Sequence, residues 1–310
     1  MGSKVYKYMG ADTLKLSLSK EDVCSFKCSH PKDFNDPYEL FLTIDFQQDP
    51  EMLATYKDTI GVMPQLPTTC FSKSPSVTPM WAHYAHGHRG VVIEIDEEIV
   101  IDSLPDVEFG DVDYRDEPSD DLLDMLARAC HIGKLRYHFL LQRGVFSAAY
   151  YTKHTCWSYE QERRLVVGNE LVNAVGDIIL LDLPVGSITS LIAGHNATQE
   201  TKDSVNVLAD NIGANYFEMN IGKTTSVPYF LDSNGMAHQY HSGSIQKCIN
   251  MCEECKEPIS EEADLCSWCS ITEDHEYQAA STNPLRMLQR MGGLEDYYES
   301  MMDVERKHDK

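Results

Sequence analysis

Two pairs of cysteines near the end of the chain constrain its fold more than any other feature. Cys252 and Cys255 form one C-x-x-C pair, and Cys266 and Cys269 form a second after ten intervening residues. Two such turns bring four thiolates to the corners of a tetrahedron, which is the closed geometry of a structural zinc site. The other cysteines are scattered among apolar residues, as is typical of reduced thiols in cytosolic proteins.

The chain is strongly acidic, both overall and around these cysteines. Its formal net charge is −23, which opposes attraction to nucleic acid and to anionic lipid. Near the cysteine pairs Lys256 stands against six acidic residues: Glu253, Glu254, Glu257, Glu261, Glu262 and Asp264. We therefore expect this module to contact another protein or to support folding. The net charge also disfavours nucleic acid as a substrate that the protein would modify, without excluding it.

The length of 310 residues suits two domains, or one domain with an appendage. Alternating strand and helix patterns predict an α+β domain over residues 1–232. It is followed by a linker at 233–247, a four-cysteine zinc ribbon at 248–275 and a helical tail at 276–310. The sequence shows neither a membrane-spanning apolar run nor a secretory signal, so we expect a cytoplasmic protein without a membrane partner.

One segment concentrates acids and bases before an apolar run. It reads WSYEQERRLVV and begins at Trp157. A strand here would put Glu160, Glu162 and Arg164 on one side. Such a strand end can hold a ligand, or it can form an ordinary surface ion pair, and the residues leave both possibilities open.

Three segments resemble, in order and separation, the bacterial family catalogued as domain of unknown function 2971. They are FNDPYE, MWAHYAHGHRGVVIEID and KHTCWSYEQERRLVV. The resemblance spans residues 5–232 and does not include the cysteine module. It implies a frequent association with phage defence but no defined activity.

A second resemblance, to the ADP-ribosyltransferase superfamily, depends on the order of the segments. A first strand ends in the aromatic Tyr8, a serine-rich strand and helix run from Phe71 to Tyr84, and a later strand is entered by glutamate. This resemblance implies a mixed split sheet with flanking helices and an NAD-binding cleft between two small sheets. It implies catalytic roles for Glu160, Glu162 and Tyr84. The cofactor-binding residues it implies are Lys7, Tyr8, Asn35, Ser72, Trp81, Trp157 and Arg164.

The leading expectation is an ADP-ribosyltransferase-like effector that consumes NAD. Such an effector would be a toxin or an anti-phage protein that modifies a nucleic-acid or protein acceptor. The alternative is a noncatalytic component of a defence or regulatory system, which binds another protein through its zinc ribbon and acidic surface. A third hypothesis, a metal-dependent nuclease with Asp36, Glu39 and Glu160, conflicts with the net charge. The oligomeric state stays open.

Overall fold

The structure is a computed structural model that describes residues 3–308, apart from 37, 39–41, 105–106 and 261–262. It divides into two compact units, Met1–Ile249 and Asn250–Lys310. In the described part of the chain, no helix combines the length and the apolar character needed to cross a bilayer.

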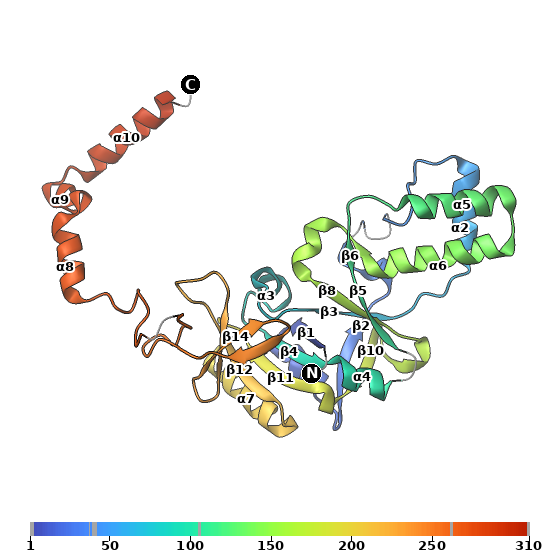
Figure 1. The fold of residues 1–310 in the computed structure, drawn as a ribbon, viewed down its shortest axis with the longest axis horizontal. Helices are drawn as coiled ribbons and strands as arrows, with labels where there is room; N and C mark the ends of the chain where they lie inside the picture. Colours follow the sequence, from blue (N-terminus) through green and yellow to red (C-terminus); the bar gives the residue numbers. More distant parts are fainter. Residues whose placement is uncertain (1–2, 37, 39–41, 105–106, 261–262, 309–310) are drawn as a thin grey trace. The chain divides into compact units, whose positions relative to one another are not determined.

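The first unit is built on a large curled sheet (Figure 1), which has ten strands among the described residues. Neighbouring strands pair antiparallel except β11 (Ile188–Ala193) and β12 (Asn215–Asn220), which are parallel and are connected by α7 (Gln199–Ile212). Helices flank the sheet, so the predicted α+β class is confirmed. From edge to edge the strands are β15 (Ser244–Lys247), β14 (Ala237–His241), β13 (Tyr229–Asp232), β12 (Asn215–Asn220), β11 (Ile188–Ala193), β4 (Val91–Asp96), β1 (Lys4–Met9), β3 (Thr68–Ser72), β8 (Glu162–Val166) and β5 (Glu108–Asp111).

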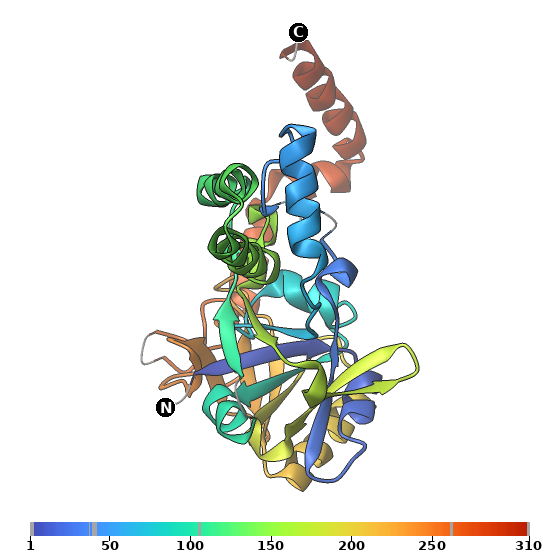
Figure 2. The same cartoon turned by 90° about the vertical axis from the view of Figure 1, so that its right-hand side faces the viewer.

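A smaller sheet packs against the large one and shares its core (Figure 2). It consists of β2 (Val23–Cys28), β10 (Ile178–Pro184) and β9 (Val172–Val175), paired antiparallel. Along β10, Leu181 and Leu183 are fully buried, as expected for alternate residues that face a core. They belong to the same core as the apolar face of β4, where Ile93 and Ile95 are also fully buried.

The large sheet is split between β1 and β3. β1 pairs with β4 at six positions but pairs with β3 only where Tyr6 lies opposite Ser72. At its other end β3 bridges to the residue after β2, because Thr68 pairs with Ser29. β3 stays in the large sheet through its pairing with β8, but it diverges from β1 toward the smaller sheet. We call the gap between β1 and β3 the sheet split.

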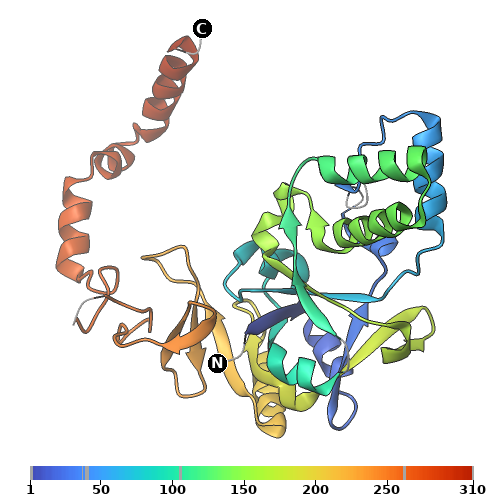
Figure 3. The same ribbon diagram turned by 45° about the vertical axis from the view of Figure 1, so that its right-hand side comes forward.

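Three helices form a layer beside β8 and have an apolar core of their own (Figure 3). They are α2 (Pro50–Gly61), α5 (Asp120–Ile132) and α6 (Leu135–Tyr151). The helical periodicity predicted from Ser119 to Tyr151 is confirmed, with a break at Gly133. Gly133 has φ 62°, a left-handed conformation that ends α5.

Further helices and two short strands complete the first unit. Asp96 caps α4 by accepting hydrogen bonds from two backbone amides, and Thr198 caps α7 in the same way with one. The remaining elements are α1 (Ala11–Ser17), η1 (Pro31–Asp33), α3 (Thr78–Tyr84), α4 (Glu97–Ser103), β6 (Asp113–Tyr114), β7 (Thr152–Lys153), η3 (Thr155–Glu160), η4 (Asn169–Leu171), η5 (Val185–Ser187) and α7 (Gln199–Ile212).

The second unit holds the four cysteines and three helices, α8 (Glu273–Thr282), α9 (Pro284–Met291) and α10 (Leu294–His308). The predicted helix start at Pro284 is confirmed, and Gly292 ends α9 with φ 77°. The structure differs from the expected linker at 233–247, because most of that segment forms β14 and β15. These strands extend the large sheet, so the first unit ends at Ile249 rather than 232.

Candidate functional site

A cavity of 360 Å³ opens at the sheet split. Much of its polar lining comes from three stretches that are far apart in the sequence, namely β1, the β3–α3 region and the β7–β8 region. The lining includes Lys7 and Tyr8 from β1, Cys70 and Ser72 from β3, Tyr84 from α3, Lys153 from β7, Glu160 from η3, and Glu162 and Arg164 from β8. A few of these side chains carry charge although they are almost fully buried, which requires specific partners.

Glu162 and Arg164 form a buried ion pair on one face of β8. Arg164 Nε and Nη2 donate to Oε1 and Oε2 of Glu162 at 2.9 and 3.0 Å, a bidentate geometry. The guanidinium also donates to the Tyr150 carbonyl at 2.7 Å, and the exposed fraction of Arg164 is 1%. Burial alone would raise the pKa of Glu162, but the charge and hydrogen bonds of Arg164 lower it to about 2. Glu162 is thus ionised at neutral pH.

Glu160 lies beside this pair but not on the strand. It ends the 3₁₀ helix η3, and Gln161 then turns the backbone with φ 47° before β8 begins. The expectation that Glu160 extends the strand is therefore wrong. Its Oε1 accepts a 2.6 Å hydrogen bond from the Tyr84 hydroxyl, and its Oε2 contacts Lys153 Nζ at 2.5 Å.

Lys153 connects the two carboxylates, and sequence reasoning did not identify this role. Its Nζ lies 2.5 Å from Glu160 Oε2 and 3.2 Å from Glu162 Oε2, in surroundings that bury all three side chains. The ammonium also lies 5.0 Å from the centre of the Trp157 ring. Lys153 precedes the two acids by seven and nine residues. No regular spacing relates them, because η3 folds the segment back.

The first strand contributes Lys7 and Tyr8. Lys7 Nζ donates to the Cys70 carbonyl at 2.6 Å and to Thr69 Oγ1 at 3.1 Å. Burial lowers the pKa of Lys7 from its ordinary value, while the neighbouring Cys70 opposes that shift. Tyr8 donates to the Ser74 carbonyl at 2.8 Å, and burial raises the pKa of its hydroxyl.

The other predicted site residues divide between the cavity and its surroundings. Ser72 and Asn35 line the cavity. Trp81 does not, because it is fully buried beneath Tyr8, with a ring-centre distance of 5.4 Å, and its Nε1 donates to the Pro75 carbonyl. Trp157 lies in an adjoining groove rather than in the cavity.

The nuclease hypothesis requires a metal site around its candidate residues, and the described residues show none there. Neither Asp36 nor Glu160 belongs to a group of three or more metal-ligating side chains there. Asp36 is buried and lies outside the cavity lining, while Glu39 falls outside the described residues.

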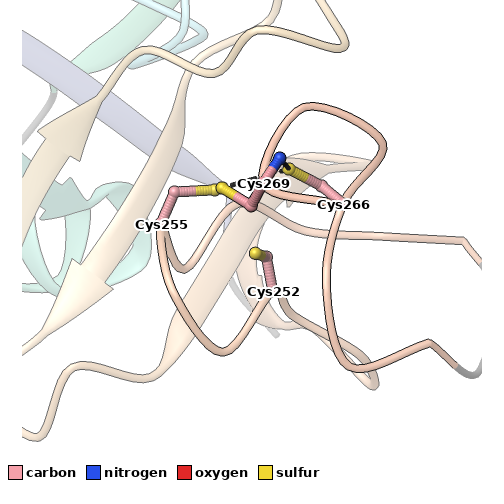
Figure 4. Close-up of side chains that lie close together, drawn as sticks. All are labelled: Cys252, Cys255, Cys266 and Cys269. Carbon is pink, nitrogen blue, oxygen red and sulfur yellow. Dashed lines mark hydrogen bonds between the residues drawn. The ribbon is translucent and has the colours of Figure 1, made fainter. Parts of the chain in front are cut away.

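The second unit brings its four cysteines together (Figure 4). The ligand atoms of Cys252, Cys255, Cys266 and Cys269 all lie within 4.8 Å of one another. A tetrahedron with zinc–sulfur bonds of about 2.3 Å has edges of about 3.8 Å. The Sγ atoms of Cys255 and Cys266 are 3.7 Å apart, so this donor set fits zinc.

Two matching turns build this centre. Lys256 N donates to the Cys252 carbonyl at 3.0 Å, and Ser270 N donates to the Cys266 carbonyl at 2.9 Å. The first turn requires Lys256 to adopt φ 63°. Hydrogen bonds from nearby backbone amides lower the pKa of Cys252 against the effect of burial, whereas burial and the neighbouring cysteines raise the pKa values of Cys255 and Cys269.

Fold and site together define an α+β protein with a charged cavity in a split sheet, followed in the chain by a four-cysteine cluster that could hold a metal ion such as zinc. A family model described as protein of unknown function (DUF2971) matches residues 80–165. This match supports the resemblance to that family over a range that includes Tyr84, Lys153, Glu160, Glu162 and Arg164. No curated protein and no solved structure matches the chain.

Proposed function

We propose that the cavity binds NAD and that the protein cleaves the nicotinamide–ribose bond, transferring ADP-ribose to an acceptor. One observation carries the proposal: five of the side chains that the superfamily resemblance singles out line a single cavity at the sheet split. They are Tyr8, Ser72, Tyr84, Glu160 and Glu162. The cavity also has the size of a small-molecule site, for which volumes of about 300–1,000 Å³ are usual.

The charges of the lining support a dinucleotide. The chain as a whole has 49 acidic residues against 26 lysines and arginines. Around the cavity, cations outnumber acids. The acidic lining residues are Asp33, Glu160 and Glu162, and the basic ones are Lys7, Lys27, Lys153 and Arg164. The cations can offset the two negative charges of the pyrophosphate, and the carboxylates can face the positive nicotinamide ring.

The contacts of the two glutamates favour different roles. Both carboxylate oxygens of Glu162 are held by the rigid guanidinium of Arg164, so this residue positions its neighbours. Glu160 is held by the flexible ammonium of Lys153 and by the hydroxyl of Tyr84. We therefore propose Glu160 as the carboxylate that faces the reacting sugar.

The proposed step is a substitution at the ribose carbon C1′. The bond between C1′ and the nicotinamide nitrogen breaks, and nicotinamide leaves as a neutral molecule with the bonding electron pair. The carboxylate of Glu160 stabilises the positive charge that develops on the sugar. A lone pair of the acceptor then forms the new bond to C1′, and the acceptor proton passes to Glu160 and on to solvent.

The test is nicotinamide release from NAD by the purified full-length protein, measured by chromatography with and without cellular extract. Glu160→Gln is expected to lower the rate by on the order of 100-fold or more, because the charge that faces the sugar is lost. Glu108→Gln is the matched control, since Glu108 is exposed on the edge strand β5 and is absent from the cavity lining. Absence of release under all conditions, or equal rates in both variants, would refute the proposal.

A finer form of the proposal is an effector of the toxin or anti-phage type. Cells that produce the intact protein would then stop growing, whereas cells that produce the Glu160→Gln variant at the same level would continue. Equal growth of the two cultures would contradict the effector role without bearing on NAD cleavage in vitro.

A noncatalytic binding role has its own supporting observation. Near the four cysteines in the sequence, Trp268 is 55% exposed and Ile271 is 45% exposed, and the acids Glu253 and Glu254 are exposed as well. A mixed aromatic and acidic surface of this kind suits a protein partner. Under this alternative, Trp268→Ala abolishes the biological effect of the protein while Glu160→Gln leaves it intact.

A further inference from the structure

An aromatic groove adjoins the cavity. It is lined by Asn35, His83, Tyr84, Cys156, Trp157 and Tyr159, with a volume of 630 Å³. Asn35 and Tyr84 also line the cavity, so the two spaces adjoin at these residues. Tyr84 sits at the junction, and its hydroxyl donates to Glu160 at 2.6 Å.

The rings of the groove hold one another in position. The centre of the Tyr159 ring lies 5.9 Å from that of His83 and 6.2 Å from that of Trp157. The His83 Nδ1 and the Tyr159 hydroxyl are 3.1 Å apart, within hydrogen-bonding distance. Contact with the buried Lys153 holds the Trp157 ring in place. Such an arrangement offers aromatic faces with little loss of conformational freedom.

The groove is unusual for this protein because its lining contains no carboxylate, lysine or arginine among the described residues. In a chain with a net charge of −23, such a surface suits a neutral ligand. The Asn35 amide and the hydroxyls of Tyr84 and Tyr159 supply hydrogen-bond donors and acceptors around the rings. A planar heterocycle could stack on the rings and bind these groups through its edge.

We infer that the aromatic groove is the acceptor subsite and that it takes a nucleobase, carried by a neutral nucleoside. The acceptor role rests on the proposed function, but binding of the base does not require NAD. In the transfer step, a ring nitrogen or exocyclic amine of the base supplies the lone pair that bonds to C1′. Nicotinamide leaves with the electrons of the broken bond, and the proton of the base passes to Glu160.

The binding test uses Cys156 as a reporter, because this exposed thiol lies in the groove. The rate at which iodoacetamide alkylates Cys156 is measured by mass spectrometry, without NAD, in the presence of adenosine, guanosine, cytidine or uridine. At least one nucleoside at millimolar concentration is expected to slow the reaction about 3-fold or more, because a stacked base covers the thiol. Trp157→Ala and Tyr159→Leu should each remove this protection, provided that their melting temperatures show a folded first unit.

The control variant is Trp268→Ala, which changes an exposed tryptophan of the second unit and should keep the protection. Equal alkylation rates with and without every nucleoside would overturn the inference. Protection by a single-stranded oligonucleotide or a tyrosine-containing peptide, but by no nucleoside, would also overturn it. Nicotinamide release without protection refutes only the acceptor subsite, whereas protection without release refutes only the proposed NAD cleavage.

Discussion

The buried pair of Glu162 and Arg164 yields a quantitative prediction about stability. In the Glu162→Gln variant, the guanidinium of Arg164 keeps its 2.7 Å hydrogen bond to the Tyr150 carbonyl but loses its ionic partner. Removal of one member of a buried ion pair typically costs about 3–5 kcal/mol. We expect a loss of this size in the free energy of unfolding at pH 7.

The same variant should have a smaller effect in acid. The pKa of Glu162 falls from 4.5 to about 2 on folding, so its ionisation stabilises the folded protein above pH 4.5. That contribution is lost as the pH falls from 4.5 through 2, and it amounts to about 3 kcal/mol in total. At pH 3 about 2 kcal/mol of this stabilisation by ionised Glu162 has been lost. Glutamine does not titrate, so the penalty of the variant should shrink by about 2 kcal/mol between pH 7 and pH 3.

Urea unfolding at several pH values between 7 and 3 measures this difference, with fluorescence of the buried Trp81 as a probe of the first unit. Other acids with lowered pKa values, such as Asp96 and Asp111, titrate in both proteins. Their contributions therefore cancel in the difference between the unfolding free energies of the two proteins. Glu108→Gln should behave as the intact protein does. A penalty that is constant from pH 7 to pH 3 would show that the carboxyl of Glu162 titrates normally, and would refute the reasoning.

Two further predictions concern the metal centre and the sheet. The purified protein should contain one zinc ion per chain by elemental analysis, and Cys266→Ser should lose it whereas Cys156→Ser should not. Gly90→Ala should lower the free energy of unfolding by about 1–3 kcal/mol, because its new Cβ would lie 2.2 Å from the Met9 carbonyl oxygen. Gly61→Ala is its control in the same urea titrations, since a Cβ there meets nothing within 4 Å and a small gain is expected.

The parts of the structure that the sequence predicted are those that local rules determine. The two C-x-x-C turns each close on themselves, so their spacing alone indicated that the four cysteines lie together, while the zinc they would hold stays a prediction. The helix that begins at Pro284 and the α5–α6 region carry capping residues and apolar periodicity within a short window. Each of these features needs no knowledge of distant segments.

The errors of sequence reasoning have a common cause, which is tertiary context. The run around Glu160 has the residues of a strand, but the left-handed turn at Gln161 separates it from β8. The polar segment 233–247 has the composition of a linker, yet β13 offers an edge on which β14 pairs, and β15 pairs with β14 in turn. Lys153 finds its partners only because η3 folds back over β8. None of these outcomes can be predicted from the periodicity of apolar residues within a short window of sequence.

The sheet split explains why the candidate site gathers residues from so many segments. Where β1 and β3 separate, backbone groups of β3 and the loop after it lose the ladder partners that a continuous sheet would supply. Side chains take their place: Lys7 donates to the Cys70 carbonyl, Tyr240 to the Lys73 carbonyl and Tyr8 to the Ser74 carbonyl. Each replacement brings a long polar side chain from another element to the edge of the gap. Opening the sheet therefore accounts for the presence of Lys7 and Tyr8 in the cavity lining, where both side chains are already held in position by these hydrogen bonds.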